Sequence, residues 1–352
     1  MVPTPGDVET LSACQPESSP LLLLRQAAVE AVEADCLLAG EDPTWQCSPA
    51  GKAVGSWEGW WTYDGVSGVD HWGVLNPNWK ICKCGRKQSP INFEPDRLLF
   101  DTHLRFVHVD KHEISGTLNN TGHDVTFFAD QRSSSPLMVS GGPLSYQYRF
   151  ERFHLHFGTV KHQRSGFENA TGSEHRVDGQ QFPAEIQLLC YSSLYDSFEK
   201  AVHQPNGVVG IAILIQMGDE PNRGLRIITD AVTRTTYKDD STPLESISLH
   251  LLLPQTEQFL TYEGSLTTPP CYETVTWIVF NKPIYMNRQQ LHMLKRLRKS
   301  TAVEKLGNNF RPPQPLHHRV VRTNIDFRRK VGKGCPSMKR EMGYKASKWL
   351  GA

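Results

Sequence analysis

The chain has 352 residues, enough for one large domain or two of average size. Hydrophobic residues make up 38% and charged residues 21%, which is typical of a globular protein that is soluble in water. The formal net charge is only +1, so no overall positive field favours nucleic acid as a partner. The longest apolar run, VVGIAILI at 208–215, is far shorter than the ~20 residues of a membrane helix and is typical of a buried strand.

The first 56 residues differ in pattern from the rest of the chain. The stretch PLLLLRQAAVEAVEADC (20–36) has four leucines followed by arginine and acidic residues. A secretory signal peptide needs an apolar core of about 7–15 residues behind a basic start. No signal peptide is therefore evident, and we expect residues 1–56 to be disordered or atypical.

Residues 57–327 have the pattern of a single domain dominated by strands. The aromatic stretches WEGWWTYDG and HWGVLNPNW indicate an ordered start. Short β-prone runs then alternate with turns, and they predict strands at 125–130, 146–158, 184–191, 208–217 and 274–280. Helices are predicted over 192–202 and 288–300.

Residues 328–352 form a basic tail. Its cations, opposed by the single acid Glu341, are Arg328, Arg329, Lys330, Lys333, Lys339, Arg340, Lys345 and Lys348. A tail of this kind is either solvated and disordered or a binding segment for an acidic surface or a sulfated glycan such as heparan sulfate.

The eight cysteines leave two interpretations open. They are Cys14, Cys36, Cys47, Cys82, Cys84, Cys190, Cys271 and Cys335. Cys82 and Cys84 are too close for a CxxC zinc pair, so the set is either scattered free thiols or the cysteines of an extracellular protein with one or two disulfides. Two glycosylation sequons, at Asn119 and Asn169, fit the extracellular interpretation.

The stretch RFHLHFG (152–158) carries the first sign of chemistry. His154 and His156 lie two apart in a β-prone run, so both side chains point to one face of a strand, roughly 6–7 Å apart. Two imidazoles on one face are the start of a metal site, which needs a further ligand from a neighbouring strand. The best candidate strand, AEIQLLCY, places Gln187 at the inward position, and no histidine is there.

Several motifs together resemble the α-carbonic anhydrases. RFHLHFG, GSEHRVDG, AEIQLL, YEGSLTTPPCYETVTW and NNFRPPQPL occur in the order and spacing of that family, over about three quarters of the chain. The resemblance implies an α+β fold: one large, mainly antiparallel, twisted sheet of ten strands with peripheral helices.

The resemblance also assigns roles to individual residues. It implies that His154 and His156 match the first two zinc ligands and that Gln187 stands at the third. It further implies that Glu174 and Glu185 match residues that orient the ligands. Thr267, with Thr268 beside it, matches the hydroxyl that orients zinc-bound hydroxide. His123 matches the histidine that acts as proton shuttle. Arg152 stands where active enzymes usually carry a glutamine.

A narrower resemblance links CYETVTW, NKPIYM, NNFRPPQPLHHRVVRTNIDF and the GCP of the tail to the carbonic anhydrase-related proteins ten and eleven. These are secreted, acatalytic homologues, prominent in nervous tissue, that bind neurexins. They typically lack the first histidine, whereas His154 is present here.

The same resemblance implies different roles for individual cysteines. It implies a disulfide between Cys271 and either Cys82 or Cys84. The spacing of the related proteins favours Cys82 and leaves Cys84 extra. Cys190 is expected to be a buried thiol. Cys335 is a candidate for an intermolecular disulfide, with neurexin or in a dimer.

A site made of two histidines and the glutamine Gln187 is predicted to bind a metal ion weakly. Hydration of CO2 needs a zinc ion that brings bound water to a pKa near 7. The neutral amide of Gln187 is a poorer zinc donor than imidazole, and the Arg152 cation opposes a dication nearby. Even a change in a residue that only orients a ligand typically costs about 10–100-fold in metal affinity. We therefore expect no bound cofactor, or zinc at low affinity.

Three functions follow from these patterns. The first is a secreted, catalytically inactive carbonic anhydrase-related protein that acts in recognition at the neuronal surface. The second is a weakened zinc-dependent carbonic anhydrase that uses His154, His156 and Gln187. The third is an extracellular module that binds heparan sulfate through its basic tail.

Overall fold

The computed structural model describes residues 60–158, 160–162, 168–299 and 303–327. The chain divides into two compact units, Met1–Trp61 and Thr62–Ala352, and the fold is that of the second unit. The segment 1–56 and the basic tail with Cys335 lie outside the described residues.

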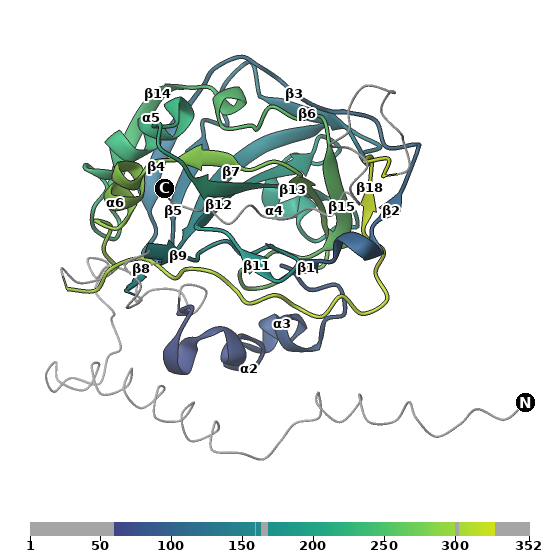
Figure 1. Cartoon of the computed structure of the whole chain (residues 1–352), viewed down its shortest axis with the longest axis horizontal. Coiled ribbons are helices and arrows are strands. Elements are labelled where there is room, and N and C mark those ends of the chain that lie inside the picture. Colours follow the sequence, from purple (N-terminus) through teal and green to yellow (C-terminus); the bar gives the residue numbers. More distant parts are fainter. Residues whose placement is uncertain (1–59, 159, 163–167, 300–302, 328–352) are drawn as a thin grey trace, which may run out of the picture. The chain divides into compact units, whose positions relative to one another are not determined.

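One large sheet forms the second unit (Figure 1). Ten of its strands follow a single hydrogen-bonded path, and the other three described strands of this sheet, β3, β6 and β17, join at its sides. In spatial order the ten are β14 (Ser241–Ile247), β4 (Ile114–Asn120), β5 (Val125–Ala129), β7 (Tyr148–Phe157), β12 (Ala184–Ser192), β13 (Val208–Met217), β16 (Val275–Phe280), β15 (Phe259–Gly264), β18 (Arg322–Thr323) and β2 (Leu99–Phe100). Parallel pairing occurs only in β13–β16, β13–β17 and β18–β2 among these described strands, so the predicted mainly antiparallel α+β fold is confirmed.

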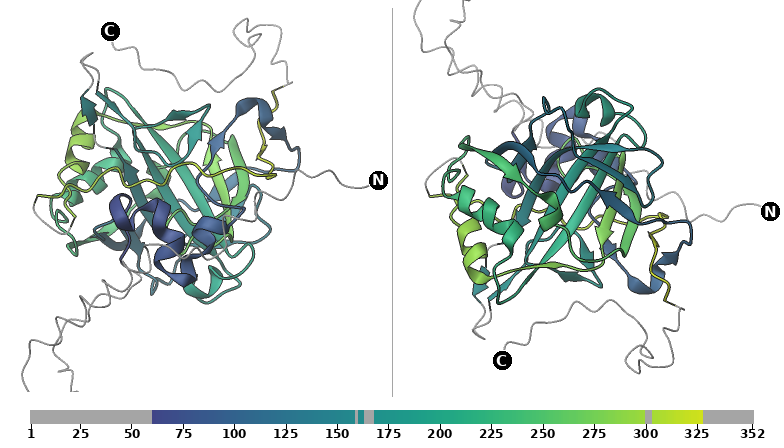
Figure 2. Two further views of the ribbon diagram at one scale, coloured as in Figure 1. Left: turned by 90° about the horizontal axis from the view of Figure 1, so that it is seen from below. Right: turned by 90° about the horizontal axis from the view of Figure 1, so that it is seen from above.

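Short elements surround this sheet (Figure 2). The remaining strands are β3 (Val107–Val109), β6 (Met138–Gly141), β17 (Ile284–Met286), β1 (Asn92–Phe93), β10 (Arg176–Val177), β11 (Gln180–Gln181), β8 (Val160–His162) and β9 (Glu168–Ala170). The α-helices are α2 (Trp72–Leu75), α3 (Ile81–Cys84), α4 (Phe198–Ala201), α5 (Arg223–Val232) and α6 (Arg288–Leu294). Single 3-10 turns are η3 (Gly65–Ser67), η4 (Val69–His71), η5 (Pro77–Trp79), η6 (Pro95–Arg97) and η7 (Leu249–Leu251).

The helices differ from the prediction more than the strands do. The helix expected over 192–202 is only α4, because a turn closed by Tyr195 N–H on the Ser192 carbonyl precedes it and Ser197 caps its first turn. The helix expected over 288–300 is α6, which a capping box of Asn287 and Gln290 starts. The ten-residue helix α5 was not predicted.

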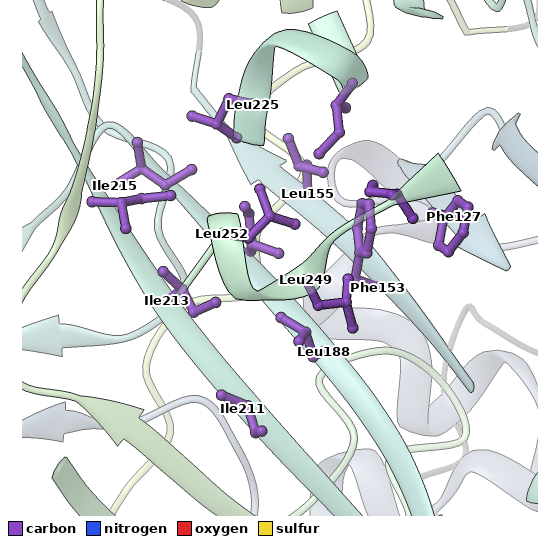
Figure 3. Packing of buried hydrophobic residues seen from close by; sticks show 14 of the residues in the cluster. Phe127, Phe153, Leu155, Leu188, Ile211, Ile213, Ile215, Leu225, Leu249 and Leu252 are labelled. Carbon is purple, nitrogen blue, oxygen red and sulfur yellow. The ribbon is translucent and has the colours of Figure 1, made fainter. Parts of the chain in front are cut away.

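The two faces of the central strands bury different partners. All nine residues of β12 are buried. Because side chains alternate along a strand, Leu188 and its neighbours on β13 face α5 and η7, as Figure 3 shows for Ile213, Leu225 and Leu252. Leu189 and Tyr191 lie in the hydrophobic cluster of the opposite face, which is the face that also carries Gln187.

Candidate functional site

Strand pairing brings the predicted site residues together. β7 and β12 run antiparallel, with His154 opposite Gln187 and His156 opposite Glu185. All four side chains are buried on one face of the sheet. The chain therefore assembles the two histidines and Gln187 as the sequence indicated.

The amide of Gln187 uses every polar atom it has. Its nitrogen donates to Glu174 Oε2 at 2.8 Å and to Glu185 Oε1 at 2.9 Å. The amide oxygen must then face His154, whose Nε2 lies 3.0 Å from it. Because an amide oxygen can only accept, His154 Nε2 carries the proton of this hydrogen bond, and a protonated ring nitrogen cannot bind a metal.

His154 is held neutral. Burial lowers its pKa to about 4, and the charges of His156 and Arg152 act in the same direction. The Arg152 guanidinium lies on the ring of Phe198, with its Cζ 4.3 Å from the ring centroid. The cation expected beside the site is thus present and disfavours a second positive charge on His154.

His156 is fixed by the C-terminal part of the domain. Its Nδ1 donates to the carbonyl of Asn309, whose side chain accepts from Phe157 N (2.9 Å) and donates to Leu155 O (2.8 Å). Its Nε2 has no hydrogen-bond partner within the described residues and lies 3.6 Å from Glu174 Oε2. Burial alone would lower the pKa of His156, but the Glu174 carboxylate and the Asn309 carbonyl outweigh it and raise that pKa.

Glu174 and Thr267 complete the buried polar group. Glu174 Oε1 accepts from Arg311 N at 2.7 Å, and burial raises the pKa of this carboxyl. The Thr267 hydroxyl lies 3.3 Å from Gln187 Oε1. The backbone carbonyl of Thr268, beside it, accepts a hydrogen bond from Cys271 N at 2.9 Å in the turn that follows.

His123 lies outside the strands that carry the buried histidines and Gln187. It lies in the turn between β4 and β5, it is partly exposed, and its backbone N–H donates to the Thr121 hydroxyl.

Sequence reasoning missed Asp124, a buried carboxylate on the same side. It accepts from Thr126 Oγ1 at 2.6 Å and from Thr121 Oγ1 at 2.8 Å. Burial alone would raise its pKa, but the nearby His154 and these hydroxyls lower it. Thr126 lies opposite His154 in the sheet. Asp124 is two residues before Thr126, so the alternation of side chains along HDVTF could have placed it on the same face as His154.

Three of the cysteine expectations can be compared with the structure. Cys82 and Cys271 form a disulfide with their Cα atoms 5.1 Å apart, and Cys190 is a buried free thiol. Cys84 is also disulfide-bonded, so it is not the spare cysteine that the spacing suggested. For Cys82, Cys84 and Cys271, the interpretation as scattered free thiols is therefore wrong.

The two sequons lie on strands. Asn119 is on β4, which is paired on both sides, and its Oδ1 is buried without a hydrogen-bond partner in the described part of the chain. The side chain of Asn119 as a whole is partly exposed. Asn169 is on β9.

The donor set does not fit a tetrahedral zinc site. Within the described ranges no group of three or more His, Cys, Asp or Glu side chains is placed to hold a metal ion. Of the described histidines, His154 and His156 stand at the predicted ligand positions, and the Nε2 proton of His154 points to the amide oxygen of Gln187. Separately, no helix in the described residues is both long and apolar enough to cross a membrane.

Comparisons with known proteins agree with this architecture. A family model described as eukaryotic-type carbonic anhydrase matches residues 67–325. A relative from Caenorhabditis elegans named "Putative carbonic anhydrase-like protein 2" is 36% identical over 296 residues, which is 81% of this chain and 86% of the relative.

Proposed function

Because the chain belongs to the eukaryotic-type carbonic anhydrase family, we propose that it is a carbonic anhydrase-like protein without CO2 hydratase activity. The observation that carries the proposal is the Gln187 amide. It bonds to His154 on one side and to Glu174 and Glu185 on the other.

A zinc ion would have to displace this network. Binding would remove the His154 Nε2 proton and break hydrogen bonds that hold two buried carboxylates. Hydrogen bonds to charged groups are each worth about 1.5–3 kcal/mol. Their loss would offset much of the free energy that a site with two imidazoles offers a metal.

The function proposed in place of catalysis is recognition of another protein outside the cell, with a neurexin as the partner. The disulfide between Cys82 and Cys271 is typical of an oxidising compartment. The resemblance to the carbonic anhydrase-related proteins ten and eleven supports the choice of partner. Cys335, outside the described residues, is the proposed point of covalent linkage, so a Cys335→Ser protein that still formed reducible adducts with neurexin would contradict the linkage.

The deciding experiment is metal analysis combined with stopped-flow CO2 hydration. The purified wild-type protein is expected to contain far less than one zinc per chain and to show no acetazolamide-sensitive hydration. Equimolar zinc with inhibitor-sensitive turnover would overturn the proposal. The Gln187→His protein, measured alongside, is expected to bind zinc more tightly, because it supplies the missing imidazole.

A second candidate is a weakened zinc-dependent hydratase. The observation in its favour is the unsatisfied Nε2 of His156 next to Glu174, with the Thr267 hydroxyl close by. The same two measurements separate it from the first proposal.

A further inference from the structure

A cluster of exposed cations lies beside helix α6. The segments 234–240, 288–299 and 304–305 hold eight Lys or Arg residues and three acids, while the whole chain has a net charge of only +1. Helices α5 and α6, from which two of these segments continue, lie side by side (Figure 1). The positive charge of this part of the domain is therefore local and not a reflection of overall composition.

Backbone hydrogen bonds hold the segment after α5 against the segment after α6. Arg298 N donates to Thr236 O at 2.8 Å, and Lys238 N donates to Lys299 O at 3.3 Å. The side chain of the buried Asn120 donates to the carbonyls of Thr236 and Arg298, each at 3.0 Å. The two segments are thus hydrogen-bonded to the central sheet through Asn120 at the end of β4.

A third segment is attached in the same way. Lys299 N donates to Glu304 O at 2.9 Å, and Leu306 N donates to Leu297 O at 3.0 Å. Residues from three parts of the sequence therefore occupy one ordered surface, and their cations need not be gathered when a ligand arrives.

Part of the charge has a structural role. Arg298 Nη1 donates to two carbonyls at the end of α6, and Lys299 pairs with Asp64 at 3.6 Å. Cations at a helix C-terminus are favoured by the helix dipole in any case. These residues are left out of the argument that follows.

Of the other six cations, Arg288 and Lys295 have interactions of their own, and four remain. We define the cationic ledge as Arg234, Lys238, Arg296 and Lys305, which are all exposed. None of the four side chains makes an ion pair or hydrogen bond within the described residues. The nearby acids are Asp239, Asp240 and Glu304; Asp240 accepts a hydrogen bond from Tyr237 N.

We propose that the cationic ledge binds a sulfated glycan. At 0.15 M ionic strength, charges act together only within about 8 Å, so a cluster on adjoining segments attracts a polyanion where scattered cations do not. The choice of a sulfated glycan rests on the proposed extracellular function, because such glycans are the polyanions of that compartment. This site is in the folded domain and is independent of the basic tail.

The test compares two full-length proteins of equal net charge. The ledge variant is Arg234→Gln/Lys238→Gln/Arg296→Gln/Lys305→Gln. The control variant changes four exposed cations elsewhere, Arg86→Gln/Arg105→Gln/Lys111→Gln/Lys282→Gln. Heparin affinity is measured across salt concentrations, and thermal unfolding checks that both variants fold.

At 0.15 M salt the ledge variant is expected to lose about tenfold in heparin affinity and to show a shallower slope of log K against log salt, while the control loses less than about threefold. Equal losses in the two variants would overturn the proposal. So would single-stranded DNA of equal charge binding to the wild-type protein as tightly as heparin.

A second measurement uses the wild-type protein alone and does not depend on any variant folding. Heparin is expected to protect Lys238 and Lys305 from lysine acetylation, read by peptide mass spectrometry, more than it protects Lys111 and Lys282. Equal protection of the four lysines would contradict the proposed site. Neither experiment involves hydratase activity or neurexin, so failure here is distinct from failure of the proposed function.

Discussion

The Nε2 atom of His154 and the Oε1 atom of Gln187 lie 3.0 Å apart, and their hydrogen bond crosslinks β7 to β12. Through its nitrogen, the same amide reaches the carboxylates of Glu174 and Glu185. The glutamine is therefore not a passive replacement for a metal ligand. It is a neutral hub that satisfies three buried polar groups at once.

Changing Gln187 to Glu should strongly destabilise the domain. The substitution removes both amide donors and places a third carboxylate beside two that are already buried. An uncompensated buried charge typically costs about 3–5 kcal/mol, which urea unfolding would measure. The exposed Gln289→Glu substitution is the control and should change the free energy of unfolding by less than about 0.5 kcal/mol. Equal effects of the two would show that the network contributes nothing to stability.

Removing the Cys82–Cys271 disulfide should also weaken the fold. The bridge closes a loop with a sequence separation of 189, and Arg311 Nη2 bonds to Cys82 O at 2.8 Å beside it. Replacing both cysteines by serine is expected to lower the free energy of unfolding by about 2–5 kcal/mol in guanidinium titrations. A loss below 1 kcal/mol would indicate that the surrounding hydrogen bonds are sufficient alone.

Cys190 should resist alkylation in the native protein. Burial in the apolar surroundings of β12 raises the pKa of its thiol well above the usual range, and Glu151 adds to the shift. Thiolate is the reactive form, so iodoacetamide at pH 8 should label the Cys190 peptide only after denaturant is added. Rapid labelling without denaturant would show that β12 opens locally.

Acid should loosen the contact between β2 and β18. The backbone N–H of His103 and then the Arg322 side chain lower the pKa of Asp101 below its ordinary 3.8. A carboxyl with a lowered folded pKa stabilises the fold above pH 3.8, and this stabilisation is lost as pH falls through the folded pKa. The Asp101→Asn protein should therefore lose less stability between pH 5 and pH 3, in the range where the carboxyl titrates, than the wild type does. Identical pH profiles would contradict this role.

The strands could be predicted, and with them the shared face of His154, His156 and Gln187, because both depend on the alternation of side chains along a strand. His154, His156 and Gln187 each lie in long apolar runs whose period of two sets the buried face. The turn before α4 was missed because a single capping residue leaves a weak pattern. Helix α5 was missed although Leu225, Ile228 and Val232 recur at helical spacing on its buried face.

The supporting partners of the site were harder to foresee. Asn309 holds His156 through its backbone carbonyl, which every residue possesses, so its identity carries no signal for that bond. Arg311 contacts Glu174 through its backbone nitrogen in the same way. Such contacts between distant segments become visible only when the chain is folded.

The bond between His156 and Asn309 joins residues separated by 153 positions. A growing chain on the ribosome can pair β7 with β12 early, yet this imidazole stays unanchored until residue 309 has emerged. Truncation before that residue would leave His156, in the centre of the sheet, without the hydrogen bond to the Asn309 carbonyl. The hydrogen bonds of the buried polar group are thus among the last contacts of the domain to form during synthesis.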